Sequence, residues 1–553
     1  MRGRVALLLG PGFFACGVGE PPSPTRILFR DVTAETGLDF VHDPGATPEK
    51  HLPETMGHGA ALFDPNEDGA LDLYVVQGGA LPVGGPAASQ PVNRLFLNEG
   101  DGAWIDATEL SGAAAHRGYG MGVATGDADG DGHTDLYLTN FAADVLVLGD
   151  GDGGFIDATE GAGLEEGRWT SGAVFFDAEW DGDLDLFVTA YVAIDLENPA
   201  WCGRREPGWR TVCHPDRFEG LQDRLWVNDG KGSFRNATEA RGVADSYGKG
   251  LAVVASDLDR DGFLDLYVAN DSVENRLWKN SGDGSFIDET LFSGTGVNRY
   301  GASEAGMGLA SGDIDDDGDF DLYVTNFDHE SNTLYRNDGG GFFSDNTPAL
   351  GLEAATRMPV AFGALMMDFD NDADLDIALV NGHIVDLIER YHDGQTYRQF
   401  ALLFQNDGEG RFVDTSPESE DFVREARVGR SLIAGDVDGD GDLDLVATEC
   451  GGRTLLFSNE TRAPRAVFLE GLQPGVRVIA TLRSGRRIHR EAGPQPSYLG
   501  QTSPHLHLGT GGEEILRLEF HRGAERMSLD LDPALTPGRY RVRRNGASWE
   551  LVR

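Results

Sequence analysis

The sequence feature that most constrains the fold is a short acidic segment that occurs seven times between Asp64 and Asp444. In its fullest form, DVDGDGDLD from Asp436, aspartates occupy positions 1, 3, 5 and 9, and glycine at position 6 permits a sharp bend. Carboxylates this close together repel one another unless a cation lies among them. Calcium takes about six to eight oxygen ligands from carboxylates, backbone carbonyls and water, so each segment predicts a calcium loop.

The ligands predicted for up to seven Ca²⁺ ions are the residues at positions 1, 3, 5 and 9. Loop by loop they are Asp64, Asn66, Asp68 and Asp72; Asp127, Asp129, Asp131 and Asp135; Asp177, Glu179, Asp181 and Asp185; Asp257, Asp259, Asp261 and Asp265; Asp313, Asp315, Asp317 and Asp321; Asp368, Asp370, Asp372 and Asp376; Asp436, Asp438, Asp440 and Asp444. In the third loop the longer Glu179 should shift the ion or the backbone. Ala373 replaces glycine in the sixth loop, so positive φ there would make this loop bind more weakly than the fourth, fifth and seventh.

The acidic loops belong to a repeat whose copies begin 50 to 80 residues apart. An apolar run precedes each loop, a β-rich run follows it, and most units then contain a turn between apolar runs, as in NRLFLNEGDGAWIDAT (93–108). Each unit therefore reads as four short strands, and such repeats predict an all-β propeller. The last unit lacks its fourth strand, which FRDVT (29–33) would supply by pairing around Leu455–Phe457. That pairing predicts a closed, seven-bladed ring.

The units resemble FG-GAP (VCBS-type) repeats, the calcium-loop blades of integrin α-subunit propellers. The whole arrangement is similar to the cartilage acidic protein family, in which an ASPIC/UnbV domain follows the propeller. Residues 475–491 and 497–511 resemble the core of that domain, although HRGAE (521–525) departs from its usual pattern. The resemblance implies a calcium-binding extracytoplasmic protein and fixes no activity. We expect a propeller over 27–461 and a small β domain over 462–553.

The N-terminal segment MRGRVALLLGPGFFAC (1–16) has two arginines followed by a short apolar run, which is typical of a secretory signal. Cleavage of an ordinary signal peptide and lipid anchoring at Cys16 both remain open, and residues 17–26 read as a linker. No other stretch predicts a transmembrane span. These features place the protein outside the cytoplasm: secreted, periplasmic or lipid-anchored at the cell surface.

The formal net charge of −47 argues against nucleic-acid binding. From Arg462 onward, however, 15 Arg or Lys residues stand against 9 Asp or Glu residues. These arginines either dock on the acidic propeller or lie on solvated strand faces. Cys202 and Cys213 lie in a long insertion of the third unit and are expected to form a disulfide in an exported protein. Cys450 is expected to be a buried free thiol.

Signals for enzymatic chemistry are sparse: the sequence contains no Walker-type glycine loop, H-E-x-x-H or G-x-S-x-G motif. His42 and His58 lie near Glu54, and His383 follows the sixth acidic loop. Two hypotheses remain. In the first, the protein is a calcium-stabilised, adhesion-type module that binds a protein or glycan. In the second, it is an exported lyase or hydrolase with an axial site near His42, His58 and His383.

Overall fold

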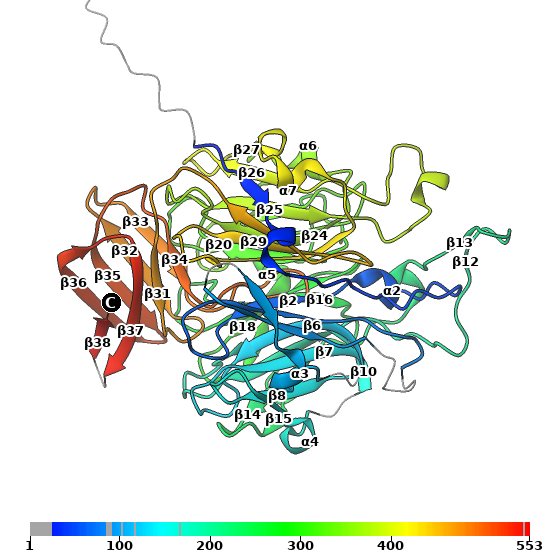
Figure 1. Ribbon diagram of the computed structural model, residues 1–553, viewed down its shortest axis with the longest axis horizontal. Helices are drawn as coiled ribbons and strands as arrows, with labels where there is room; N and C mark the ends of the chain where they lie inside the picture. The colour runs from blue at the N-terminus through cyan, green and yellow to red at the C-terminus, as the bar shows by residue number, and fades with distance from the viewer. Residues whose placement is uncertain are drawn as a thin grey trace, which may run out of the picture.

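Four short antiparallel strands form around each acidic loop in the computed structural model, which describes residues 25–83, 91–100, 103–115, 118–164, 167–545 and 548–552 (Figure 1). In the first unit the order in the sheet is β2 (Ala60–Phe63), β3 (Asp72–Val75), β4 (Arg94–Asn98) and β5 (Trp104–Asp106). The acidic loop joins the first two strands of this unit. We call each such four-stranded unit a blade.

The remaining blades repeat this order. They are β6 (Tyr119–Gly126), β7 (Asp135–Ala143), β8 (Val145–Gly149) and β9 (Phe155–Asp157); β10 (Gly167–Phe176), β11 (Asp185–Ala190), β14 (Arg224–Asn228) and β15 (Phe234–Asn236); β16 (Gly250–Ser256), β17 (Asp265–Asn270), β18 (Arg276–Asn280) and β19 (Phe286–Asp288); β20 (Leu309–Gly312), β21 (Asp321–Val324), β22 (Thr333–Asn337) and β23 (Phe343–Asp345); β24 (Ala361–Met367), β25 (Asp376–Asn381), β26 (Leu402–Asn406) and β27 (Phe412–Asp414); and β28 (Gly429–Gly435), β29 (Asp444–Glu449), β30 (Leu455–Asn459) and β1 (Phe29–Asp31).

The ring closes through the N-terminal strand. Strand β1 pairs antiparallel with β30, with Phe29 opposite Asn459 and Asp31 opposite Phe457. The innermost strands contact one another in the cyclic order β2, β6, β10, β16, β20, β24, β28 and back to β2. The predicted all-β propeller and its closing strand are therefore confirmed.

Helices in the described residues are single turns in the connections. They are α1 (Thr33–Thr36), α2 (Pro53–Met56), α3 (Thr108–Ser111), α4 (Thr159–Ala162), α5 (Thr290–Ser293), α6 (Glu353–Thr356), α7 (Asp421–Arg424), and the 3₁₀ turns η2 (Pro215–Arg217), η3 (Ile388–Arg390) and η4 (Ser416–Glu418). In the insertion of the third blade, β12 (Cys202–Gly203) pairs with β13 (Arg210–Thr211).

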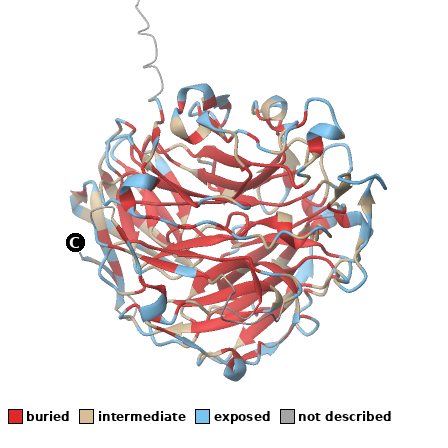
Figure 2. Cartoon of the chain, turned by 45° about the vertical axis from the view of Figure 1, so that its right-hand side comes forward, coloured by how far each residue is buried: buried red, intermediate tan, exposed pale blue. Residues whose placement is uncertain are grey.

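Adjacent blades pack through both faces of each strand, because side chains alternate along a strand. In β17, Leu266 and Val268 join a cluster with the third blade, whereas Tyr267 packs with Leu322 of the fifth blade. Figure 2 shows the resulting buried residues running through the blades, with exposed residues concentrated in the connections. This two-sided burial explains why the strand after each acidic loop is almost wholly apolar.

The C-terminal residues form two further four-stranded sheets beside the ring (Figure 1). One has the order β34 (Leu506–Leu508), β31 (Val467–Glu470), β37 (Gly538–Asn545), β38 (Ser548–Val552), and the other β33 (Arg487–Glu491), β32 (Arg477–Leu482), β35 (Ile515–Arg522), β36 (Glu525–Leu535). An apolar core that includes Leu469 of one sheet and Leu518 of the other holds them together. We call residues 462–553 the C-terminal unit. Its assignment as an ASPIC/UnbV domain stays a prediction.

A segment of the C-terminal unit, residues 497–503, enters the ring. Leu499 O accepts a hydrogen bond from Val123 N (3.2 Å), Gln501 N donates to Ala60 O (3.0 Å), and Ser503 N donates to Ala434 O (2.9 Å). The segment therefore bonds to the inner strands of three blades. Close approach requires small residues there, since a Cβ on Gly122 would lie 2.9 Å from Leu499 O.

The ring axis is consequently a packed apolar core. Tyr498 is fully buried, and its hydroxyl donates to Met56 O (3.1 Å) from the segment that covers the opposite side of the ring. Leu52 and Met56 from that segment share a cluster with Tyr498, Leu499 and Phe362. The axis is thus filled from both sides.

Candidate metal centres

The seven acidic loops share one backbone conformation. Position 6 has positive φ in every loop, from 83° at Ala373 to 107° at Gly182. Ala373 therefore has the positive φ on which the expectation of weaker binding by the sixth loop depends. Position 4 also has positive φ in every loop, although it is occupied by residues as large as Trp180 (φ 57°). Sequence reasoning missed this second left-handed position, because no glycine pattern marks it.

Backbone donors hold the carboxylates in place, as the second loop illustrates. Asp127 Oδ2 accepts from Gly132 N (3.0 Å), and Asp131 Oδ1 accepts from His133 N (2.9 Å). At position 9, Asp135 accepts from Gly149 N (2.8 Å) at the end of the third strand. The aspartate at position 9 therefore connects the loop to the third strand of its own blade through one carboxylate oxygen, while the other oxygen accepts a hydrogen bond from Ala128 N within the loop.

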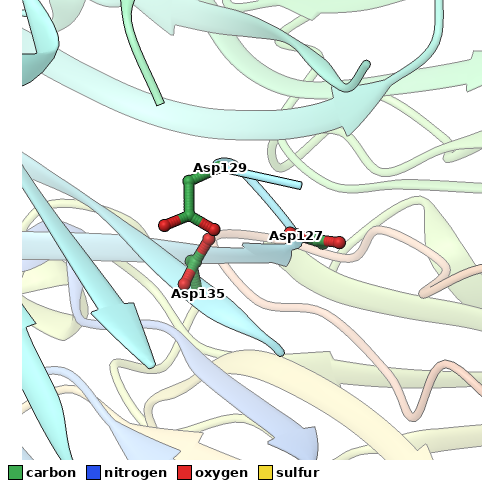
Figure 3. Close-up of side chains that lie close together, drawn as sticks. All are labelled: Asp127, Asp129 and Asp135. Atoms are coloured by element: carbon green, nitrogen blue, oxygen red, sulfur yellow. The ribbon is translucent and has the colours of Figure 1, made fainter. Parts of the chain in front are cut away.

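The carboxylates of five loops gather closely enough to hold a metal ion. One oxygen from each member lies within 4.8 Å of the others in five groups: Asp127, Asp129 and Asp135; Asp257, Asp259 and Asp261; Asp313, Asp315 and Asp321; Asp368, Asp370 and Asp376; Asp436, Asp438 and Asp444. Figure 3 shows the Asp129 and Asp135 carboxylates facing each other beside Asp127. Among the described residues, the first and third loops form no such group.

Burial makes these groups electrostatically costly. It raises the pKa of Asp135 to about 7 and that of Asp313 to about 7, and neighbouring loop carboxylates add to the effect. Burial likewise raises the pKa of Asp72 to about 8, against the opposing effect of a backbone hydrogen bond. Asp313 Oδ1 and Asp370 Oδ1 are buried and find no hydrogen-bond donor within the described chain. The carboxylate oxygens of these loops therefore fit a hard cation such as calcium.

Lysine and arginine side chains of the described chain form ion pairs with predicted ligands of four of the loops. Lys279 contacts Asp259 and lies 3.5 Å from Asp261 in the fourth loop. The equivalent strand position in the fifth blade is Arg336, which contacts Asp315 and lies 3.6 Å from Asp317. Lys279 and Arg336 each directly precede the asparagine that ends the third strand of their blade, in RLWKN (276–280) and LYRN (334–337). The sequence therefore did contain a signal for these two ion pairs.

In the third and seventh loops the cation comes from the C-terminal unit. Arg522 Nη2 lies 3.4 Å from Asp177 Oδ2, while Glu179 turns to Arg241 (2.7 Å). Arg539 Nη2 lies 3.0 Å from Asp436 Oδ2. Among the described residues, no lysine or arginine pairs with the predicted ligands of the first, second or sixth loop.

Further arginines of the C-terminal unit bind the loop backbones. Arg477 donates to Gly318 O (2.6 Å) and to Asp257 O (2.9 Å), and Arg490 donates to Ala373 O (3.0 Å). Of the two interpretations left open by the sequence, docking on the acidic propeller is the one observed. The basic tail thus covers one face of the ring and compensates part of its charge.

An asparagine in the hairpin of six blades links each blade to the preceding one. Asn280 Nδ2 donates to Leu264 O (3.1 Å) of its own loop and to Ala178 O (2.8 Å) of the preceding acidic loop. Equivalent bonds come from Asn98, Asn228, Asn337, Asn406 and Asn459. Gly149 takes this position in the second blade. The sequence suggested only a turn residue here, because the partner carbonyl belongs to another repeat.

Comparison with known proteins places the repeats in a family. A family model for the FG-GAP-like repeat matches residues 64–138, 127–188, 218–268, 257–324, 313–379 and 368–447, which together make up more than half of the chain. The chain belongs to the FG-GAP-like repeat family. The resemblance of the propeller units to FG-GAP repeats is thus confirmed.

Relatives of this FG-GAP protein include cartilage acidic protein 1 of Homo sapiens, 22% identical over 505 residues that cover 84% of this chain and 69% of the relative. The Mus musculus protein of the same name is 22% identical over 554 residues, covering 93% and 77%. Weaker structural similarity extends to an Agrocybe aegerita lectin that recognises non-reducing terminal N-acetylglucosamine (TM-score 0.36, 15% identity, 66% of this chain and 87% of that one). It also extends to YCF48 bound to D1 peptide (TM-score 0.40, 10% identity, 76% and 98%).

The histidines of the FG-GAP propeller that suggested an axial site are buried. The rings of His42 and His58 stack with centroids 4.3 Å apart, and His42 Nδ1 accepts from Gly451 N (3.1 Å). Burial lowers the pKa of His42 to about 3. Arg430 bonds to the backbone of His383 (3.3 Å). Because Leu52, Met56 and Tyr498 fill the axis, this arrangement does not favour the enzyme hypothesis.

The cysteines of the FG-GAP protein follow the prediction. Cys202 and Cys213 form a disulfide, with Cα atoms 5.2 Å apart. Cys450 is a buried free thiol, whose Sγ donates to Glu54 O (3.4 Å). The predicted signal segment 1–16, with Cys16, and all of the linker but its last two residues lie outside the described residues. Within the part of the chain that the structure describes, no helix has the length and apolar character needed to cross a bilayer.

Proposed function

We propose that this FG-GAP propeller is an exported, calcium-binding interaction module. The observation that carries the calcium assignment is the sixth loop. Asp368, Asp370 and Asp376 are each 1% exposed and gather within 4.8 Å, and Asp370 Oδ1 has no donor among the described residues. Among the described residues no lysine or arginine forms an ion pair with these three carboxylates, although Arg486 pairs with Asp374 of the same loop (2.6 Å) and Arg490 bonds Ala373 O. Three buried carboxylates without a directly paired cation are otherwise unfavourable.

The second and sixth loops are the best candidates for calcium, since both offer four carboxylates and, among the described residues, none of those carboxylates forms an ion pair with a lysine or arginine. When bound, the cation would remove the repulsion between these carboxylates and tie the loop to its blade. The fourth, fifth and seventh loops fit a cation as well, but Lys279, Arg336 and Arg539 would compete with it. The first loop has one carboxylate fewer. In the third loop Arg522 pairs with Asp177, and Arg241 pairs with Glu179.

Export and partner binding are supported by separate features. The Cys202–Cys213 disulfide is typical of proteins that fold in oxidising compartments. The acidic-loop face and the ring axis are occupied by the C-terminal unit, so the opposite face, with its long connections, is the surface left for a partner. A closed propeller presents such connections on a rigid scaffold.

Calcium binding can be tested at the sixth loop with a matched control. We expect Asp370→Asn/Asp372→Asn to reduce the number of calcium ions bound per chain, measured by isothermal titration calorimetry, and to lower the melting temperature in calcium. The control Asp393→Asn/Glu409→Gln makes the same change in charge at exposed positions of the same blade. Equal calcium binding by both variants would contradict the assignment.

A further inference from the structure

The most distinctive surface of the molecule outside the acidic loops is the disulfide-linked hairpin of residues 201–213, which we call the arginine hairpin. Strands β12 and β13 and the Cys202–Cys213 bridge define it. Figure 1 shows it projecting at the end of the molecule opposite the C-terminal unit. It therefore lies on the side that the acidic loops and the basic tail leave uncovered.

A connection of the sixth blade holds the arginine hairpin in place. The Tyr391 hydroxyl donates to Trp209 O, and Arg390 Nη1 donates to Gly208 O (3.2 Å). The Trp209 and Tyr391 rings pack edge to face with centroids 5.5 Å apart. The hairpin is thus fixed at its base by the disulfide and along its length by these contacts, which lowers the entropy lost when it binds a partner.

Guanidinium groups and indole rings alternate on this hairpin. Arg204 Cζ lies 4.6 Å from the centroid of the Trp209 ring, and Arg210 Cζ lies 4.8 Å from that of the Trp201 ring. Trp201 is 42% exposed, and Arg204 and Arg205 are exposed. Within the described chain, none of Arg204, Arg205 and Arg210 forms an ion pair. Stacking orients the guanidinium groups but leaves their N–H edges free for anions.

We propose that the arginine hairpin binds an anionic polysaccharide, with the arginines bonding its carboxylate or sulfate groups and Trp201 packing on a sugar ring. This inference rests on the proposed interaction role and names its surface and partner class. Guanidinium groups pair with planar oxyanions through two parallel hydrogen bonds. The chain has a net charge of −47, and its positive charge outside the hairpin is concentrated in the C-terminal unit at the other end of the molecule, so the hairpin is a basic, aromatic site on an otherwise acidic propeller. In physiological salt, charges on distant parts of the surface are largely screened from the polymer at the hairpin, so their repulsion does not cancel the attraction to the hairpin arginines.

The test measures binding of the full-length, calcium-loaded protein to immobilised polymers: hyaluronate with carboxylates only, chondroitin sulfate with carboxylates and sulfates, and neutral dextran. We expect the two anionic polymers to bind and dextran not to bind; the ratio of their affinities identifies the preferred group. Arg204→Ala/Arg205→Ala/Arg210→Ala should weaken binding at least about 100-fold, since each charge-assisted bond is worth roughly tenfold. Trp201→Ala should weaken it about fivefold.

The control variant Lys231→Ala/Arg235→Ala/Arg411→Ala removes the same charge from exposed positions on the blades and should bind as the wild type does. Equal binding by the hairpin and control variants overturns the proposal, as does the absence of binding to both anionic polymers. Hairpin-dependent binding of an acidic protein, including a second copy of this chain, without polymer binding also overturns it. An unchanged melting temperature confirms that the hairpin variant is folded. If calcium still stabilises a protein that binds no polymer, only this inference fails and the calcium assignment stands.

Discussion

The fourth and sixth acidic loops have the same four carboxylate positions, yet they neutralise this charge differently. In the fourth blade Lys279 reaches Asp259 and Asp261, whereas the same strand position in the sixth blade is Gln405, whose amide donates to Asp370 Oδ2 (2.6 Å). The predicted ligands of the fourth loop are therefore paired with a tethered cation, whereas those of the sixth loop are not; there Arg486 pairs instead with Asp374, outside the predicted ligand set (2.6 Å). Identical ligand patterns thus do not imply identical dependence on calcium.

The comparison also bears on the affinity order expected from the sequence. Ala373 does have positive φ, which is the physical basis for weaker binding by the sixth loop. The structure adds an opposing factor, because calcium entering the fourth loop has to displace Lys279 from two carboxylates. Since displacement of a charged group costs more than one strained residue, we now expect the sixth loop to bind more tightly than the fourth.

The largest expected effect comes from removing calcium altogether. A ligand that binds only the folded state stabilises it by about 2.7 kcal/mol per site when its free concentration is 100 times the Kd. Chelation should therefore lower the melting temperature strongly, mainly through the second and sixth loops. Differential scanning calorimetry with and without a chelator measures this shift. An unchanged melting curve would mean that the chain's own basic residues already satisfy the loops.

Buried His42 makes a contribution to the pH dependence of stability that does not involve the acidic loops. The pKa of buried His42 is lowered to about 3, so between pH 6.5 and 3 the unfolded chain binds a proton that the folded chain does not. The contribution of His42 to stability is full above pH 6.5 and falls as the pH falls, by about 2 kcal/mol at pH 5. The loop carboxylates with raised pKa contribute with the opposite sign, so the effect of His42 is the difference between wild type and variant in urea unfolding of the chelated protein across this range. His42→Phe, which keeps a stacked ring, should reduce the slope; an identical slope would contradict the assignment to His42.

Exchanging the residues that differ between the two loops should exchange their behaviour. We expect Lys279→Gln to strengthen calcium binding in the fourth loop and Gln405→Lys to weaken it in the sixth, each by about 1.5 kcal/mol after allowance for the partly exposed lysine. Calorimetric titration of each variant, with the other loop inactivated by Asp→Asn, resolves the two sites. Unchanged calcium affinity of the fourth loop in Lys279→Gln would show that Lys279 is a bystander there.

The smallest expected effect concerns the backbone of the sixth loop. Ala373→Gly relieves the left-handed strain, so the free energy of calcium binding should become more favourable by about 0.5–1 kcal/mol. The same change removes the restriction that alanine imposes on the unfolded chain, which lowers overall stability. Overall stability is a poor measure here, because Ala373 is also buried against the core of the C-terminal unit. The calcium Kd of the sixth loop is the quantity to measure. Unchanged or weaker binding would refute the strain argument.

Much of the propeller could be predicted from the sequence because its determinants are local. Loop positions 1, 3, 5, 6 and 9, the strand after each loop and the hairpin turn all lie within one repeat, so their spacing is visible along the chain. The closing pair of β1 and β30 could be inferred because one strand was missing at one end and present at the other. The Cys202–Cys213 bridge followed from an insertion with two cysteines in a chain that was expected to be exported.

The sequence by itself therefore determined the repeat, the closed ring and the positions of the candidate ligands. Only the tertiary structure decided which arginines of the C-terminal unit pair with the loops, since Arg522 and Arg539 are 345 and 103 residues away along the chain from Asp177 and Asp436. It also placed Tyr498 in the ring axis and bonded Asn280 to the preceding blade. Periodicity records which face of a strand is buried but not which distant segment covers it, so contacts between blades and between the ring and the C-terminal unit leave no local pattern.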